Sequence, residues 1–220
     1  MLLRGEFFVI LFLSLIYLFA YFKLSFKKIL LIFFISIIVI SPYLIRNISI
    51  FETATITKTL GYNLWKGNNP SSTVEGSALI NQSLKNKIEK IEKNKFYGIS
   101  YDKIFLREAI KNISEDPKKY LILFIKKIAS FQFITINSSQ SNYYNSFHYI
   151  PLLLLGITSI IGIILADKKS HKMNYLILLY FINLFIFSSF FILPRYKLAI
   201  LPLQIIFTNI LISYINKKYF

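Results

Sequence analysis

Cysteine is absent from this chain of 220 residues, and histidine occurs only twice. Without cysteine the protein can form neither disulfide bonds nor thiolate metal sites. The two histidines, His148 and His171, fall at opposite ends of one apolar segment, so they cannot share a metal ion. We therefore expect neither a metal ion nor a cofactor.

Acidic residues are also scarce, because 10 Asp and Glu stand against 26 Lys and Arg, for a formal net charge of +16. In a soluble protein this excess would indicate a nucleic-acid partner. Here the lysines border long apolar segments and populate one polar loop, as they do beside membrane spans. We therefore expect membrane lipids as partners and no nucleic acid.

Apolar residues are abundant: they make up 55% of the chain, and the mean hydropathy is +0.55. Lipid offers the backbone no hydrogen-bond partners, so runs of this length predict membrane-spanning helices. The alternation typical of a membrane β-barrel is not seen. The expected fold is an all-α polytopic membrane protein with about five transmembrane helices and one large, mostly helical outer loop. The five apolar runs lie at about 7–22, 29–45, 149–166, 173–193 and 198–215.

Lysine clusters give the expected orientation, because short cytoplasmic connections carry an excess of positive charge. With five alternating spans all three clusters fall on one side, which the positive-inside rule makes cytoplasmic, so the loop 46–146 is expected on the outer side of the membrane. The expected domains are residues 1–45 with two spans, the outer loop 46–146, and residues 147–220 with three spans. The clusters are Lys23, Lys27 and Lys28; Lys168, Lys169 and Lys172; and Lys217 and Lys218.

The amino terminus conflicts with this topology. Arg4 followed by an apolar run is typical of a signal anchor, whose start stays inside. That choice would put the first lysine cluster outside. We therefore expect that earlier spans are missing and that the chain is the carboxyl-terminal part of a larger protein.

The long loop has its own predicted helices. Residues 78–96 predict a helix whose stripe (Ile80, Leu84, Ile88 and Ile91) packs on the loop's third helix or, alternatively, on a partner. A second helix is expected at about 101–114, after Ser100 as N-cap. The third begins at Pro117 and runs to about 133. Lys118, Lys119, Lys126 and Lys127 interrupt its apolar face, which favours a helix along the outer membrane surface over a sixth span.

Arginine is rare, yet three of the four arginines are expected at the outer boundary of the membrane. Arg4 opens the first span, Arg46 ends the second in SPYLIRN, and Arg195 precedes Tyr196 in the turn PRYKLAILPL. A guanidinium grips phosphate oxygens bidentately, so the cluster indicates an anionic lipid ligand. The alternatives are an arginine that merely snorkels to water and neutralisation of Arg4 by Glu6.

At these motifs the chain resembles the carboxyl-terminal half of bacterial GT-C glycosyltransferases, the relatives of protein mannosyltransferases and aminoarabinose-type lipid A transferases. The resemblance rests on SPYLIRN, GYNLWKGNNP and PRYKLAILP in this order, and it covers residues 4–220. It implies a bacterial inner (cytoplasmic) membrane as the location and a polyprenyl-phosphate-linked sugar as substrate, with transfer on the outer side, where the large loop lies. The resemblance implies Arg46, Arg195 and Tyr196 as lipid-phosphate ligands, and the predicted topology adds Arg4 to them. The implied cavity or loop residues are Asn47, Gly61, Trp65, Gly67, Asn68, Asn69 and Pro70.

The loop residues have a second interpretation, since Gly-Asn-Asn-Pro is ordinary turn chemistry and Trp65 could dock the loop on the membrane. The family's catalytic carboxylate lies in a first outer loop that has no match here. Catalytic residues are therefore unknown, and we expect the chain alone to be inactive, as a carrier-binding fragment that needs a missing amino-terminal half.

Two other function classes stay open. A transporter subunit would have ionisable groups at mid-membrane, whereas these spans are nearly free of charge there. A non-enzymatic membrane scaffold would use the stripe of helix 78–96 to bind a partner.

Overall fold

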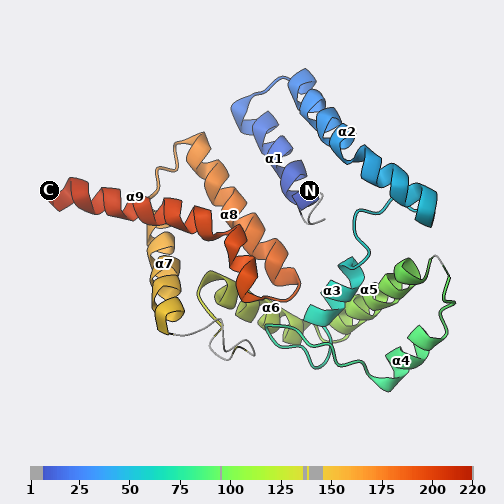
Figure 1. Ribbon diagram of the computed structural model, residues 1–220. Helices are drawn as coiled ribbons and strands as arrows, with labels where there is room; N and C mark the ends of the chain where they lie inside the picture. The colour runs from blue at the N-terminus through green and yellow to red at the C-terminus, as the bar shows by residue number, and fades with distance from the viewer. Residues whose placement is uncertain (1–6, 95, 136–137, 139–145, 220) are drawn as a thin grey trace. The chain divides into compact units, whose positions relative to one another are not determined.

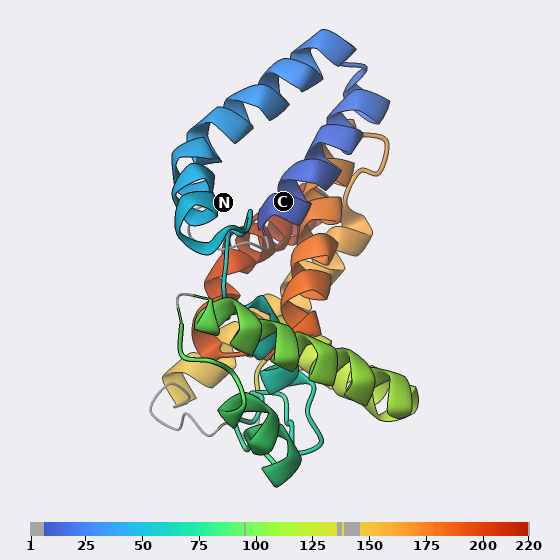
Figure 2. The same ribbon diagram turned by 90° about the vertical axis from the view of Figure 1, so that its right-hand side faces the viewer.

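The computed structural model describes residues 7–94, 96–135, 138 and 146–219 (Figures 1 and 2). Helices make up most of these residues, and no β-strand occurs among them, so the predicted all-α class is confirmed. The elements are α1 (Phe7–Phe22), α2 (Phe26–Phe51), α3 (Leu60–Gly67), α4 (Gln82–Glu89), α5 (Tyr97–Glu115), α6 (Pro117–Gln132), α7 (Ser146–Leu165), α8 (His171–Ser189), the 3-10 helix η2 (Pro194–Ala199) and α9 (Leu201–Tyr219).

The protein is an all-α polytopic membrane protein. Helices α2, α7 and α8 are each long and apolar enough to cross a bilayer, and α1 is a shorter apolar helix. Large apolar side chains such as Ile38 and Val39 on α2 are exposed, which suits contact with lipid tails. Together with α9, these helices occupy the five segments in which spans were predicted.

The chain divides into two compact units. Unit 1 contains residues 1–71 and 77–116, and unit 2 contains residues 72–76 and 117–220. In unit 1, α1 and α2 form a hairpin, and α3 packs along α5 beside α4 (Figures 1 and 2). In unit 2, α7 packs along α9, while α6 packs on α8 and η2. Helix α6, grouped with the loop in the sequence analysis, thus makes its contacts with the carboxyl-terminal helices.

Helix α3 was not predicted, because its segment is rich in Thr, Ser, Gly and Asn. A carboxylate from a distant helix caps it: Asp102 on α5 accepts hydrogen bonds from the backbone N–H groups of Gly61 (3.0 Å) and Tyr62 (2.8 Å). Gly61 also allows close packing, since a Cβ atom there would collide with the Asp102 backbone carbonyl. The core beneath is Trp65 with Leu84, Phe105 and Ala109.

Two helix boundaries in unit 1 were predicted wrongly. Helix α4 spans Gln82–Glu89 rather than 78–96, because the Asn81 side chain accepts from the Leu84 N–H and caps the helix there. Helix α5 begins at Tyr97, so Ser100 lies inside it and is not its N-cap. Of the predicted stripe, Leu84 and Ile88 pack on the α3–α5 core and not on the loop's third helix, whereas Ile80 is exposed and lies before α4.

Unit 2 has an aromatic core with a buried polar network at its edge. Phe131, Tyr180 and Phe207 belong to the core. The Tyr180 hydroxyl donates to the Gln132 side-chain oxygen, and the Gln132 amide donates to the Gly156 carbonyl (2.8 Å). The network therefore joins α6, α7 and α8, and its buried amide and hydroxyl groups are hydrogen-bonded, as burial requires.

Helix α6 presents its lysines to two different environments. Lys118, Lys119 and Lys126 are exposed, as is expected of a helix at a membrane surface. Lys127 is instead fully buried, on the face that carries Tyr120, Leu123 and Phe131. Four lysines were predicted to interrupt the apolar face of this helix, and of these Lys127 lies within the core.

Candidate functional site

The segment after α8 forms the turn predicted around PRYK. Phe190 caps α8, and the chain is extended at Leu193 before Pro194 starts η2. Proline suits the first position of a helix because its missing N–H would have no partner there. Two backbone hydrogen bonds hold the turn: Tyr196 N–H to the Leu193 carbonyl (2.9 Å), and Ile200 N–H to the Lys197 carbonyl (3.0 Å).

The 3-10 geometry separates the cations of the motif. A 3-10 helix has three residues per turn, so Lys197 lies on the same face as Ile200. Both side chains are buried, whereas Arg195 is exposed. Tyr196 is half-buried, with its ring 6.0 Å from that of Phe187. The turn therefore directs Arg195 outward and Lys197 inward.

The Lys197 amine has no counter-charge in the described part of the chain. It is one of two buried side-chain atoms there without a hydrogen-bond partner, the other being the Ser188 hydroxyl. Burial lowers the pKa of the Lys197 amine from 10.5 to about 8, so at pH 7 it remains mostly protonated. A buried, unpaired ammonium is costly. An anion that reached this amine would remove the cost, so the turn has the chemistry of an anion site.

Two further arginines, Arg46 and Arg4, were predicted to bind the same phosphate as Arg195. Arg46 is exposed near the end of α2, where its guanidinium lies 3.4 Å from the side-chain oxygen of Asn47. Asn47 is buried and donates to the Thr55 carbonyl (2.6 Å), so it fixes the chain that leaves α2. Arg4 lies outside the described residues. The common phosphate pocket of Arg4, Arg46 and Arg195 stays a prediction.

The predicted loop residues lie in and beside the core of unit 1. Trp65 is buried and its ring centroid lies 4.7 Å from that of Phe105, in an edge-on arrangement. The Asn68 amide donates to the Leu64 carbonyl at the end of α3. The Asn69 amide donates to the Ser77 carbonyl (2.6 Å), which closes the loop that follows. The side chains of Trp65, Asn68 and Asn69 thus have structural contacts.

Lys197 is the residue that the sequence analysis missed, although it belongs to the quoted motif. Arg195 was preferred because a guanidinium suits phosphate geometry better than an amine does. The indication available in the sequence was the spacing Pro194, Lys197, Ile200, which is the repeat of a 3-10 turn begun by proline. That repeat places the lysine on the apolar side.

Comparison with known proteins identifies no relative: no family model, no curated protein and no solved structure matches the chain.

Proposed function

We propose that this chain is the carrier-binding part of a bacterial inner-membrane glycosyltransferase, and that η2 binds the phosphate of a polyprenyl-phosphate-linked sugar on the outer side. The observation that carries the proposal is the buried, unpaired amine of Lys197 within the PRYK turn. A phosphate would supply the counter-charge that the described protein groups do not.

Arg195 and Tyr196 have supporting roles in this proposal. The exposed guanidinium of Arg195 attracts a lipid phosphate at the headgroup level, and its fork suits two phosphate oxygens. The ring of Tyr196 contacts Phe187 and Phe191, which holds the turn against the end of α8. Lys197 reaches the phosphate through its flexible four-carbon stem, since such side chains extend their charged end along apolar surroundings.

Apolar helices suit the rest of such a ligand. An isoprenoid chain is a hydrocarbon, and exposed apolar side chains near the turn include Leu198 on η2 and Ile205 on α9. The isoprenoid tail would therefore stay in the bilayer beside unit 2, while its phosphate meets the turn.

The test is equilibrium binding of polyprenyl phosphate to the purified full chain in nanodiscs, with polyprenol as the ligand that lacks the phosphate. Polyprenyl phosphate should bind, polyprenol should not, and Lys197→Met should weaken binding about tenfold or more, because hydrogen bonds to charged groups contribute about 1.5–3 kcal/mol. Lys126→Met, an exposed lysine on α6, is the matched control and should bind as wild type does. Equal binding of polyprenol, or an unchanged affinity in Lys197→Met, contradicts the proposal.

A further inference from the structure

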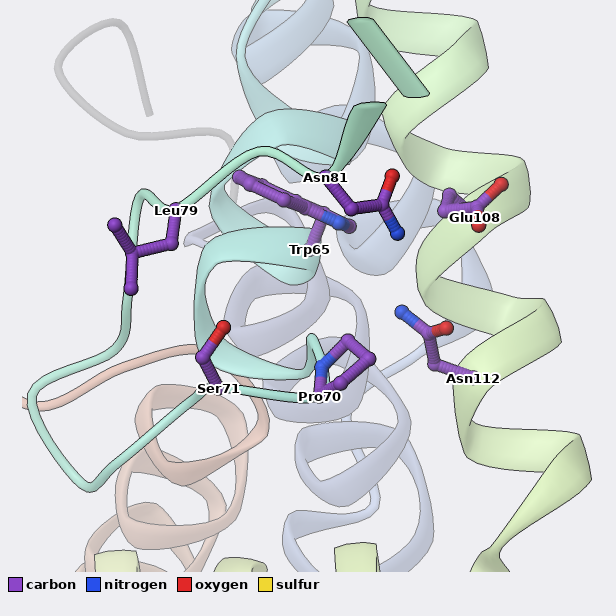
Figure 3. A pocket seen from close by; sticks show the side chains of 7 residues that line it. All are labelled: Trp65, Pro70, Ser71, Leu79, Asn81, Glu108 and Asn112. Carbon is purple, nitrogen blue, oxygen red and sulfur yellow. The ribbon is translucent and has the colours of Figure 1, made fainter. Parts of the chain in front are cut away.

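Unit 1 contains a small cavity between α3, α5 and the segment that leads from α3 to α4 (Figure 3). Its volume is about 60 Å³, which is enough for more than one water molecule. Trp65 from α3 forms one wall, and Glu108 and Asn112 from α5 line the other side. The exposed residues Pro70 and Leu79 lie at its rim.

The indole N–H of Trp65 is directed into this cavity. The Trp65 residue is 2% exposed, but its ring nitrogen is not among the fully enclosed unpaired atoms of the described residues, because it opens on the cavity (Figure 3). Buried indole N–H groups usually find a partner. A donor that faces a cavity bonds either to water there or to an acceptor atom of a ligand that displaces the water.

Two amide groups add donors around the same space. The Asn81 oxygen is occupied as the cap of α4, because it accepts from the Leu84 N–H (2.9 Å), and its amide nitrogen turns toward the indole (Figure 3). The Asn112 amide donates one hydrogen to the Asn68 carbonyl (3.3 Å) and keeps a second. Three donor groups thus line the same cavity.

Glu108 supplies an acceptor on the same wall. One of its carboxylate oxygens pairs with the Lys87 amine at 3.0 Å, and the other oxygen remains for a ligand. A carboxylate disfavours an anionic ligand, while the donors require an oxygen acceptor. The ligand group is therefore neutral and has both a carbonyl-type oxygen and an N–H.

We propose that this cavity binds the acetamido group of an N-acetylated sugar. The acetamido oxygen accepts from Trp65 and the two asparagine amides, and its N–H donates to Glu108. Its methyl group lies against the apolar rim of Pro70 and Leu79. The cavity has a volume of about 60 Å³ and takes this substituent, and the sugar ring lies outside the rim.

That the acetamido group belongs to a sugar, either the transferred one or the acceptor, rests on the proposed glycosyltransferase function. The cavity itself consists of unit 1 residues, whereas the proposed phosphate site lies in unit 2. Each site is therefore measured separately, with its own ligand.

The test is saturation-transfer difference NMR of N-acetylglucosamine with the full chain in nanodiscs, with glucose as the ligand without the acetamido group. The acetyl methyl protons should receive the strongest saturation, and glucose should not compete. Trp65→Phe keeps an aromatic ring in the core, and Glu108→Gln keeps the shape of the side chain. Each should weaken binding about three- to tenfold, the effect of one hydrogen bond. Glu89→Gln, exposed on α4 and outside the cavity, should bind as wild type does.

Glucose that competes as well as N-acetylglucosamine, or an affinity unchanged in both Trp65→Phe and Glu108→Gln, overturns this inference. If Trp65→Phe fails to fold, Ser71→Trp replaces it, because Ser71 is an exposed rim residue and a larger side chain there should block entry. If the wild-type chain binds polyprenyl phosphate but not N-acetylglucosamine, this inference alone is overturned. If it binds N-acetylglucosamine but not polyprenyl phosphate, the proposed function alone is overturned.

Discussion

Replacing Lys197 by methionine should stabilise the unliganded protein, even though it removes the proposed ligand contact. The pKa of this amine is 10.5 in an unfolded chain and about 8 in the folded protein, because burial disfavours the charged form. At about 1.4 kcal/mol for each tenfold change in proton affinity, the protonated lysine reduces the free energy of unfolding by about 3 kcal/mol. Methionine has no charge to desolvate, so the variant should gain an amount of this order.

The gain has a defined pH dependence. Below about pH 8 the lysine is protonated in both states, so its full cost is present. Between pH 8 and 10.5 the unfolded chain binds more protons than the folded one, so wild-type stability rises with pH. Above pH 10.5 the cost is absent. The stability difference between Lys197→Met and wild type should therefore be largest below pH 8 and shrink toward pH 10.5.

The assay is unfolding in mixed micelles with increasing SDS, followed by far-ultraviolet circular dichroism at several pH values. Lys126→Met is the control, because an exposed lysine should change stability by no more than about 0.5 kcal/mol. A Lys197→Met variant that is less stable than wild type at pH 7 would refute the reasoning, as would a stability gain that persists unchanged at pH 10.5.

Three further predictions concern packing, charge and topology. Burial lowers the pKa of Lys127 to about 7, so wild type sheds this buried proton as the pH rises, which a guanidinium cannot do. In the same SDS assay Lys127→Arg should therefore be less stable than wild type by about 3 kcal/mol at pH 9 and by much less at pH 7. A difference that does not grow with pH would contradict this cause. Gly162 lies against the α9 backbone, so Gly162→Leu should lower the free energy of unfolding by at least about 1–3 kcal/mol. Gly98→Ala is the control, because Gly98 has room for a methyl group, and the stability of this variant should change little. Equal losses of stability in the two variants would contradict the close α7–α9 packing. In this cysteine-free chain, Arg46→Cys and Arg195→Cys should both react with a membrane-impermeant maleimide added outside, and labelling from opposite sides would exclude a common phosphate pocket.

The membrane helices could be predicted from the sequence because their signal is local. A long apolar run specifies a helix in lipid whatever surrounds it. A helix occupies most of each of the five predicted runs, and α2, α7 and α8 are long and apolar enough to span a membrane. Helix α6 was also predicted closely, since Pro117 marks its start in the sequence itself. These elements need no information from distant residues.

The helices of the loop were harder to predict because distant residues determine their ends. Helix α3 depends on the Asp102 carboxylate, which lies on α5 about 40 residues further along the chain. The burial of Trp65 against Phe105 likewise becomes evident only when the two helices are packed. The sequence does contain a local signal for the start of α4, because Asn81 is a typical N-cap residue. The prediction instead followed the apolar stripe, which extends beyond both ends of the helix.

The sequence predicted the position of the candidate site but not which of its cations is buried. The motif PRYK stood out for its cations, and nothing in an irregular turn would predict that Lys197 is buried. Only the three-residue period of η2 places Lys197 beside the apolar core and leaves Arg195 outside. The spacing of Tyr120, Leu123 and Lys127 likewise predicts one face of α6, although a lysine seldom lies buried there.

The account depends most on the claim that the PRYK turn binds a lipid phosphate. It is tested most directly by photo-crosslinking of the full chain in nanodiscs, with a polyprenyl phosphate that carries a diazirine next to the phosphate, and by mass-spectrometric mapping of the labelled peptides. We predict labelling concentrated at Pro194–Ala199 and on the side chains packed against it, suppressed by excess unlabelled polyprenyl phosphate but not by polyprenol, and lost in Lys197→Met. Labelling that is spread evenly over the apolar helices, or that polyprenol suppresses equally well, would contradict the claim.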